Sequence, residues 1–328
     1  MHRRGFLAAL AGVSLLRVAR ADAALDPSRL KSLERDARGT TLFLSLEHAP
    51  FPVGGAFAGG YRDDTVVVFV PAHFRFRDDE GVAALVHFHG HNTTAERSIT
   101  THELREQLAE SRQNAVLVVP QLAVTAPDSS CGKLEAPGGL ARLLAEALAT
   151  TARAGRITLG DTAFPPDVAL GTVCVSAHSG GYHAAACCLR GGGVDVRETY
   201  LFDALYTESD AFRDWVVARR GEPLHQRHKL VSYFTEGGTT EAQNRSLRTE
   251  LERAGVLCEY EAQEGEISRR DLSHADAVFV RTGLWHANVT WETNALRDCL
   301  YASALPRHLP TTWFARKTGA RPIDKRQR

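Results

Sequence analysis

The stretch from Val175 to Gly181 holds the residues of this chain whose types and spacing most clearly indicate chemistry. Ser179 lies there between an apolar, β-branched run and a segment rich in Ala, Cys and Leu that is typical of a helix. A serine in a sharp strand-to-helix turn needs small neighbours two positions away on each side, and here these are Ala177 and Gly181. Such a turn sets the hydroxyl beside a helix N-terminus, where negative charge is stabilised. The pattern predicts a nucleophilic serine, and the alternative is an ordinary serine at the start of a helix.

A nucleophilic serine needs a histidine as base and an acid that orients the histidine. His286, just before a predicted final helix, is the favoured base, and His274, in a charged loop, is the alternative. Asp203 is the favoured acid, because a carboxylate at the tip of an apolar strand is costly to bury unless it is paired. Glu236, which follows the next strand, is the alternative acid.

A second motif, His-Phe-His-Gly-His-Asn at residues 87–92, ends another apolar run. Gly90 permits a close approach of the backbone to a ligand. The backbone N–H of His91 or of a near neighbour such as Asn92, together with that of Gly180, is expected to hold an oxyanion.

These two motifs and the order of the elements resemble the α/β-hydrolase superfamily, whose serine motif is usually written G-x-S-x-G. This chain departs from it only by the small residue Ala177. The resemblance implies a mostly parallel central sheet with helices on both faces and the order Ser179, Asp203, His286 for the catalytic residues. It also implies hydrolysis of a carboxylic ester, in a small molecule or a polymer, through an acyl-serine intermediate, with no cofactor or metal.

Other functions remain open from the sequence. The same three residues would serve an amidase or peptidase. His87, His89 and His91 alternate, so that in an extended chain they project to one side and would ligate zinc in a metal-dependent hydrolase. A non-catalytic binding protein with the hydrolase fold is the third possibility, since fold does not imply function.

The elements that must position these residues alternate between strand-like and helix-like runs, which predicts an α/β fold with a largely parallel sheet. The predicted strands are 41–46, 65–70, 82–89, 115–119, 168–175, 196–202, 229–234, 256–260 and 277–280. The predicted helices are 101–111, 140–153, 182–190, 241–254 and 290–305. Residues 121–139, rich in Pro, Ser, Asp and Gly, are predicted to form a loop over the site.

The two ends of the chain are interpreted separately from the domain. Residues 1–23 carry Arg3-Arg4, a short apolar run and small residues suited to cleavage, which predicts a twin-arginine signal and export to the bacterial periplasm or beyond. The apolar run is too short to span a bilayer, so no integral membrane contact is expected. Residues 24–314 are predicted to form one domain and the basic residues 315–328 a disordered, solvated tail.

The composition limits the classes of partner that this protein is expected to bind. The 39 basic and 39 acidic residues give a formal net charge of zero, which argues against a nucleic-acid partner. Export would permit disulfide bonds between the cysteines. The sequence has no C-x-x-C spacing that would indicate a zinc or redox site. Cys131, in a polar loop, is expected to be accessible, and the default for Cys174, Cys187 and Cys188 is burial as small apolar groups. The sequence does not give the pairing of these cysteines with one another or with Cys258 and Cys299.

Overall fold

The computed structural model describes residues 29–53, 59–307, 320–321 and 323–327. The predicted signal segment 1–23 lies outside these residues, as do parts of the predicted domain and of the predicted tail. Within the described residues, no helix is both long enough and apolar enough to cross a membrane.

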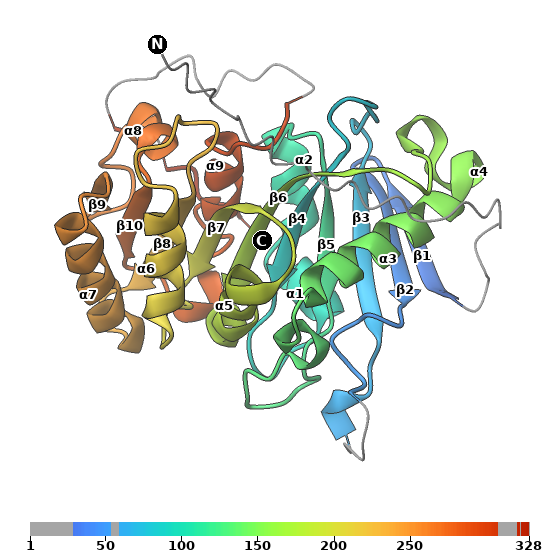
Figure 1. The fold of residues 1–328 in the computed structure, drawn as a ribbon, viewed down its shortest axis with the longest axis horizontal. Helices are drawn as coiled ribbons and strands as arrows, with labels where there is room; N and C mark the ends of the chain where they lie inside the picture. The colour runs from blue at the N-terminus through green and yellow to red at the C-terminus, as the bar shows by residue number, and fades with distance from the viewer. Residues whose placement is uncertain (1–28, 54–58, 308–319, 322, 328) are drawn as a thin grey trace, which may run out of the picture.

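One large sheet runs through the described part of the chain (Figure 1). Its strands are β1 (Leu30–Asp36), β2 (Gly39–Ser45), β3 (Thr65–Pro71), β4 (Val82–Phe88), β5 (Ala115–Pro120), β6 (Leu170–His178), β7 (Val196–Phe202), β8 (Lys229–Thr235), β9 (Cys258–Glu261) and β10 (Ala277–Thr282). Their order is β1-β2-β3-β5-β4-β6-β7-β8-β10-β9. The pairs β1–β2, β2–β3 and β3–β5 are antiparallel, and the other pairs are parallel.

The sheet separates two apolar cores because successive side chains of a strand point to opposite faces. In β3, Val66 and Val68 belong to one core, whereas Val67 and Phe69 belong to the other. Both faces of the central strands are therefore buried, which explains why these strands read as continuous apolar runs.

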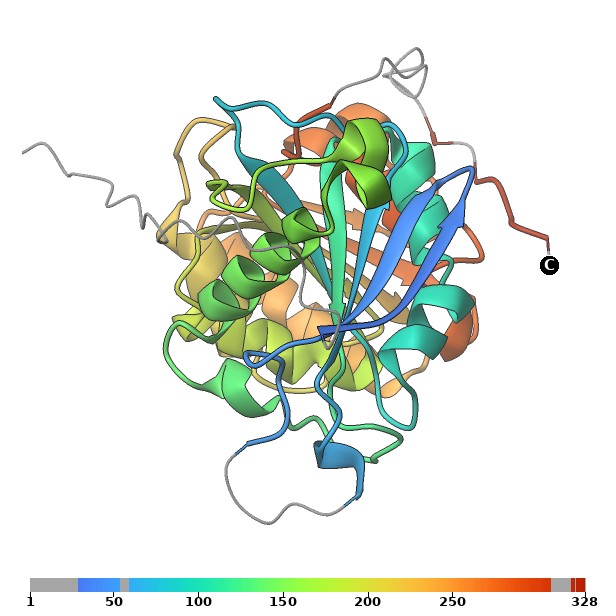
Figure 2. The ribbon, with the colours of Figure 1, turned by 90° about the vertical axis from the view of Figure 1, so that its right-hand side faces the viewer.

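Helices cover both faces of the sheet (Figure 2). One face packs against α3 (Gly139–Arg153), α5 (Tyr182–Gly191), α6 (Ser209–Ala218) and α7 (Thr239–Arg253). The other packs against α1 (Ala95–Thr101), α2 (Leu104–Ser111), α8 (Arg269–His274) and α9 (Ala295–Tyr301). A short helix, α4 (Gly155–Leu159), follows α3. The predicted fold class, a mostly parallel sheet between two helical layers, is confirmed.

The order of the central strands opens a crevice at one edge of the sheet. The chain passes from β4 to β5 through α1 and α2 on one face. It returns through α3 on the other face and places β6 on the opposite side of β4. Because the segments that leave β4 and β6 diverge to opposite faces, the carboxyl ends of these two strands form the expected place for a ligand. His87 pairs with Ser176 and Phe88 with Ala177, so the two sequence motifs lie side by side.

Several elements differ from the prediction for local reasons. The predicted helix 101–111 begins later, at Leu104, because Glu103 adopts a left-handed conformation with φ 50°, and α1, which ends at Thr101, lies before the predicted range. The predicted helix 290–305 shortens to α9, which begins after Asn294 at φ 61°. The edge strand β1, in which all residues after Leu30 are exposed, was not predicted because it lacks an apolar alternation. Neither were α4, α6 and α8.

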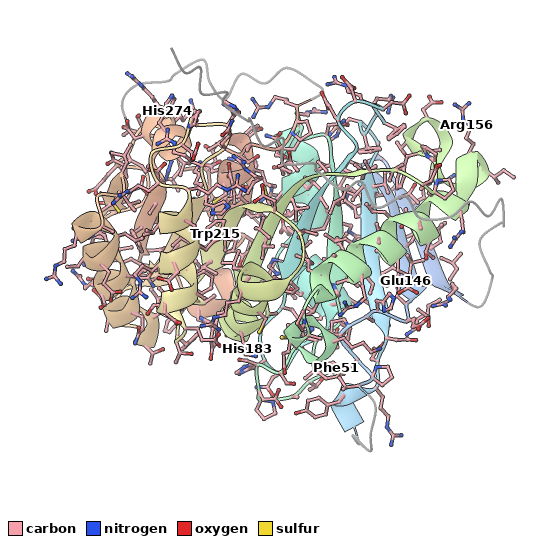
Figure 3. The ribbon with its side chains drawn as sticks, viewed as in Figure 1. Phe51, Glu146, Arg156, His183, Trp215 and His274 are labelled. Atoms are coloured by element: carbon pink, nitrogen blue, oxygen red, sulfur yellow. The ribbon has the colours of Figure 1, made fainter. Side chains whose placement is uncertain are left out.

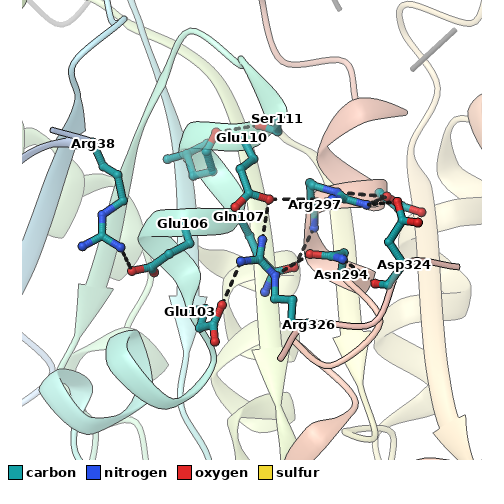
Figure 4. Close-up of polar contacts among 12 residues, drawn as sticks. Arg38, Glu103, Glu106, Gln107, Glu110, Ser111, Asn294, Arg297, Asp324 and Arg326 are labelled. Carbon is teal, nitrogen blue, oxygen red and sulfur yellow. Dashed lines mark hydrogen bonds and ion pairs between the residues drawn. The ribbon is translucent and has the colours of Figure 1, made fainter. Parts of the chain in front are cut away.

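The described residues of the C-terminal segment, 320–321 and 323–327, pack against the domain, whereas the rest of the predicted tail 315–328 lies outside the described residues. The guanidinium of Arg326 donates to Glu103 at 2.8 Å and also reaches Glu110 (Figure 4). Arg321 forms an ion pair with Glu261 at 2.9 Å, and the two side chains are 1% and 0% exposed. The basic residues of this segment therefore meet acidic groups that lie far away in the sequence.

Cysteine burial also differs from the expectation at two positions, Cys131 and Cys187. Cys131, expected to be accessible, is fully buried in the core beneath α3 and α5, whereas Cys187 is half-buried. Cys174 and Cys188 are buried, as predicted. All six cysteines are free thiols in the structure.

Candidate active site

Ser179 occupies the sharp turn between β6 and α5 that the sequence predicts. Its φ of 52° is strained for a residue with a side chain. A Cβ added at Gly181 would lie 2.4 Å from the carbonyl oxygen of Phe88, and one at Gly90 would lie 2.7 Å from the Ser179 Cβ. Small residues are therefore needed because this turn is pressed against the end of β4.

Asp203 follows the last residue of β7 and is buried, with φ 46°. Its Oδ2 accepts a hydrogen bond from the Nδ1–H of His286 at 2.6 Å and one from the Thr235 hydroxyl at 3.1 Å. Its Oδ1 accepts from the hydroxyl of Thr240 and from the backbone N–H of Thr235. Each carboxylate oxygen thus has its own set of donors, as a buried charge requires.

These donors decide the charge of Asp203. Burial alone would raise its pKa, but the hydrogen bonds from His286 and Thr240 outweigh burial and hold the pKa below its ordinary value. Asp203 is therefore a carboxylate at neutral pH. A carboxylate at Nδ1 fixes the tautomer of His286 that carries its proton there and leaves Nε2 as the acceptor.

His178 connects His286 to the serine turn. The Nε2–H of His178 donates to the backbone carbonyl of His286 at 3.0 Å, and the two ring centroids are 4.7 Å apart. Burial lowers the pKa of His178 to about 4, so its ring is neutral at pH 7. The imidazole of His286 is thus held next to the residue that precedes Ser179, with 42% of its side chain exposed.

The Ser179 hydroxyl interacts with the phenol of Tyr206, whose pKa is raised by burial and lowered in part by this contact. Among the hydrogen bonds of the described residues, none joins Ser179 to His286. Catalytic hydrogen bonds often form only when substrate is bound.

The predicted oxyanion residues are adjacent, but they are not equivalent. The backbone N–H of Asn92 donates to the carbonyl of Ala126 at 3.0 Å and is not available to a ligand. No partner is recorded for the backbone N–H of His91 or of Gly180 among the turn and loop hydrogen bonds of the described residues. The His91 ring covers Gly180 so closely that a Cβ there would lie 2.1 Å from the ring.

The two alternative triad residues lie elsewhere. Glu236 has 62% of its side chain exposed and forms an ion pair with Arg281 at 3.0 Å. His274, labelled on α8 in Figure 3, is exposed and its Nδ1–H donates to the backbone carbonyl of Arg270. His274 precedes β10 and therefore lies at the amino end of that strand, away from Ser179. The structure brings neither residue to the serine turn.

The three alternating histidines do not converge on a common centre. The Nδ1 of His87 bonds the Ser176 hydroxyl at 2.8 Å. The Nε2 of His89 accepts the backbone N–H of Leu122 at 2.9 Å, so its lone pair is occupied. His91 is exposed, and its Nε2 contacts Ser129. The strand β4 ends at Phe88, so the strict alternation that would align the three rings does not extend to His89 and His91.

Sequence reasoning missed Tyr206, Thr235 and Thr240 as partners of the site. Their only signal is position: Tyr206 follows Asp203 closely, and Thr235 ends β8 beside it. A cavity of about 290 Å³ lies beside the site, lined in part by Asn92, His102 and Trp291. A larger cavity of about 560 Å³ lies at the opposite edge of the sheet and does not include any of the residues above.

Comparisons with known proteins give only distant likenesses. No family model matches the sequence, and no curated protein does. Among solved structures, an S-formylglutathione hydrolase from Agrobacterium tumefaciens is 12% identical and aligns over 84% of this chain and 99% of its own, with a TM-score of 0.46. The serine hydrolase FphF from Staphylococcus aureus is 12% identical over 79% and 95%, with a TM-score of 0.44. Carboxyl esterase 2 from Tuber melanosporum is 14% identical over 83% and 89%, with the same score.

The sheet, the serine turn and the acid–histidine pair of this chain are sufficient to assign its fold. A mostly parallel sheet lies between two layers of helices, and a strained serine turn follows β6 at the crevice beside β4. An acid at the end of β7 and a histidine after β10 face each other across the same edge. By its strand order and its serine turn, this chain has the fold of the α/β-hydrolase superfamily.

Proposed function

We propose that this protein is a serine hydrolase that cleaves carboxylic esters. The observation that carries the proposal is the Asp203–His286 pair, with an Nδ1–Oδ2 distance of 2.6 Å, held by His178 against the strained turn of Ser179. A base, its orienting acid and a partly exposed hydroxyl at one strand edge are the parts that acyl transfer needs.

In the proposed reaction, the Oγ of Ser179 attacks the carbonyl carbon of the ester while Nε2 of His286 takes the hydroxyl proton. The backbone N–H groups of His91 and Gly180 stabilise the resulting oxyanion. The intermediate expels the alcohol, which receives the proton from His286. Water then attacks the acyl-serine by the same route and releases the acid and the free serine.

The cavity beside the site borders the proposed oxyanion and base residues through Asn92 and Ala287, although Ser179 and His286 do not line it. Its volume of about 290 Å³ lies at the lower end of the range for small-molecule sites. Arg97 and Asn92 contribute polar groups to its lining. We propose short-chain esters as the substrate class. Export by a twin-arginine signal, and hence a periplasmic or secreted location, remains a proposal that rests on residues 1–23.

A fluorophosphonate probe tests the proposed nucleophile directly, because the probe labels only activated serines. We expect labelling of the wild-type protein and none of Ser179→Ala, with Ser130→Ala as the matched control. Hydrolysis of p-nitrophenyl acetate should disappear in the same variant. Equal labelling of wild type and Ser179→Ala would overturn the proposal.

A second pair of variants tests the base. His286→Ala should lose esterase activity by several orders of magnitude, whereas His274→Ala, which changes the alternative histidine, should keep it. Circular dichroism of each variant checks that the fold is retained. The opposite outcome would assign the base to His274 and reject the geometry proposed above.

A further inference from the structure

Two cysteines, a histidine and a glutamate that lie apart in the sequence gather beside the first turns of α5. His183 and Cys187 are one helical turn apart on α5, so both project from the same side of that helix. Cys131 and Glu135 come from the loop after β5, at the short helix η3 (Gly132–Glu135). In the described part of the chain, Cys131, His183 and Cys187 are the group whose potential metal-binding atoms all lie within 4.8 Å of one another.

The distances between these atoms fit a tetrahedral centre. The Sγ of Cys187 lies 3.6 Å from Nε2 of His183. The Oε1 of Glu135 lies 3.8 Å from the same Nε2 and 3.9 Å from the Sγ of Cys131. Ligands bound to Zn²⁺ at about 2.0–2.3 Å in a tetrahedron lie about 3.3–3.8 Å from one another. Small movements would therefore bring the atoms of Cys131, His183 and Cys187 to bonding distance of one ion, whereas the carboxylate of Glu135, which is outside that group of three, would have to turn toward Cys187 to become the fourth ligand.

The surroundings of His183 favour the same interpretation. Its Nδ1–H donates to Glu208 at 2.5 Å, which directs the lone pair of Nε2 toward the two sulfurs (Figure 3 labels His183). A carboxylate behind a histidine is the usual outer partner of a metal-binding imidazole. Arg190 in turn binds Glu208, so the carboxylate is fixed by a second group.

The thiols of Cys131 and Cys187 interact, and this interaction shifts their pKa values in opposite directions. The bond from Cys131 lowers the pKa of Cys187, whereas the bond to Cys187, together with burial, raises the pKa of Cys131. A cation bound by both sulfurs would convert them to thiolate ligands and release their protons to solvent.

We propose that Cys131, Glu135, His183 and Cys187 bind one Zn²⁺ ion, which fastens the loop after β5 to the helix that follows Ser179. Two thiolates, an imidazole and a carboxylate form a closed ligand set, which is typical of a structural site. His183 lies one turn after the serine, and Ser129 of the same loop contacts His91. The ion would hold the nucleophile turn and the proposed oxyanion residues in register.

Sequence reasoning did not find this site because the ligands come from two separate segments. The spacing His-x-x-x-Cys on α5 is not a zinc motif by itself, and Cys131 was expected to be accessible rather than buried against Cys187. Only the packing of η3 on α5 brings the two segments together.

Metal analysis of the full-length mature protein tests the proposal. Purified without chelator, the wild type should contain about one Zn²⁺ per chain, and denaturation in chelator should reveal six free thiols. After removal of metal under reducing conditions, Zn²⁺ should rebind with one equivalent and raise the melting temperature. Co²⁺ in its place should produce the thiolate-to-cobalt absorption band.

Matched variants locate the ion. Cys187→Ser and His183→Gln should lose stoichiometric binding, whereas Cys258→Ser, another half-buried cysteine, should bind as the wild type does. Glu208→Gln should weaken binding about 10- to 100-fold. Ser179→Ala should bind Zn²⁺ normally, so these results do not depend on the proposed esterase activity.

Three results would overturn the proposal: reduced wild type that takes up no stoichiometric Zn²⁺, binding that persists in both Cys187→Ser and His183→Gln, or isolated protein in which Cys131 and Cys187 form a disulfide. Each is read from the wild type or from two independent variants, so a single misfolded variant does not decide the outcome.

Discussion

Burial acts on the titratable residues of this site in two different ways. Asp203 is buried among donors that stabilise its charge, so its pKa is lowered. His89 and His178 are buried without a compensating carboxylate in contact, and the pKa of each falls to about 4. The acid therefore stays ionised and the supporting histidines stay neutral at pH 7, which keeps charge only where the proposed reaction uses it.

Replacement of Asp203 by Asn tests the role of its charge. Asp203→Asn leaves the shape nearly unchanged but no longer selects the tautomer of His286, so kcat for ester hydrolysis should fall by about four orders of magnitude. The control is Glu236→Gln, which changes an exposed carboxylate and should have no effect. Steady-state kinetics on p-nitrophenyl acetate measures both, and a variant of Asp203 with nearly full activity would rule out this residue as the acid.

His89 should make stability depend on pH. Because its pKa is about 4 when folded and ordinary when unfolded, the unfolded chain takes up its proton first as the pH falls. The contribution of His89 to the free energy of unfolding is complete above about pH 6.5 and declines toward pH 4. The decline amounts to about 2 kcal/mol between pH 7 and pH 5. Urea unfolding measures the free energy of unfolding at these two pH values. From pH 7 to pH 5 this free energy should fall by about 2 kcal/mol less in His89→Gln than in the wild type. Equal losses would contradict the buried neutral state.

At the residue scale, the sequence predicted the site residues whose type and position indicate chemistry, but not the residues that support them. Asp203 was found because a charge at the tip of an apolar strand needs a partner. Thr240 was not found, because a threonine in the first turn of a helix has no distinguishing pattern until the fold places it against Asp203. The occupied N–H of Asn92 was equally unpredictable, since its acceptor Ala126 comes from another loop.

At the scale of elements, the contact between β4 and the turn before α5 limits which residue can occupy position 181. Gly181 has an ordinary backbone conformation, so its requirement is for space rather than for flexibility. The neighbouring atom is a backbone oxygen, that of Phe88, and cannot move aside as a side chain would.

Gly181→Ala should therefore destabilise the protein by about 1–3 kcal/mol, the usual cost of overpacking. Gly191 lies at the other end of α5 and a Cβ there would meet nothing within 4 Å. Gly191→Ala should be neutral or stabilising by up to about 1 kcal/mol, because alanine is the better helix former. Urea unfolding compares the two, and equal effects would show that the contact at Phe88 is not tight.

The pattern of elements was largely predictable, for physical reasons that differ along the chain. Strands buried on both faces, such as β4 and β6, have continuous apolar runs that the sequence displays. The exposed strand β1 and the short helix α8 have no such run, since neither is covered on more than one side. Helix ends also escaped prediction where a non-glycine residue such as Glu103 takes a left-handed conformation.

At the scale of the whole molecule, the described residues of the C-terminal segment, 320–321 and 323–327, pack against the domain. Its basic residues suggested a solvated tail because the sequence does not show that their acidic partners lie at and just before α2 and at the end of β9. Arg321 and Glu261 form the innermost of these contacts, and burial raises the pKa of Glu261 even though Arg321 opposes this effect.

Arg321→Ala should destabilise the protein by about 3–5 kcal/mol, because it leaves Glu261 buried without its partner. The control is Lys325→Ala, which breaks an exposed ion pair with Glu292 and should cost at most about 1 kcal/mol. Thermal and urea unfolding of both variants measure the difference. A small effect of Arg321→Ala would mean that the segment is not held as described.

The pairing of β4 with β6 also governs when the site comes into existence during folding. The strand between them in sequence, β5, lies on the far side of β4, so His87 meets Ser176 only after a loop of 89 residues has closed. Contacts between such distant segments form late, because the entropy of chain closure must be lost before they contribute. We therefore expect the appearance of catalytic activity to lag behind the formation of secondary structure when the unfolded chain is returned to native conditions.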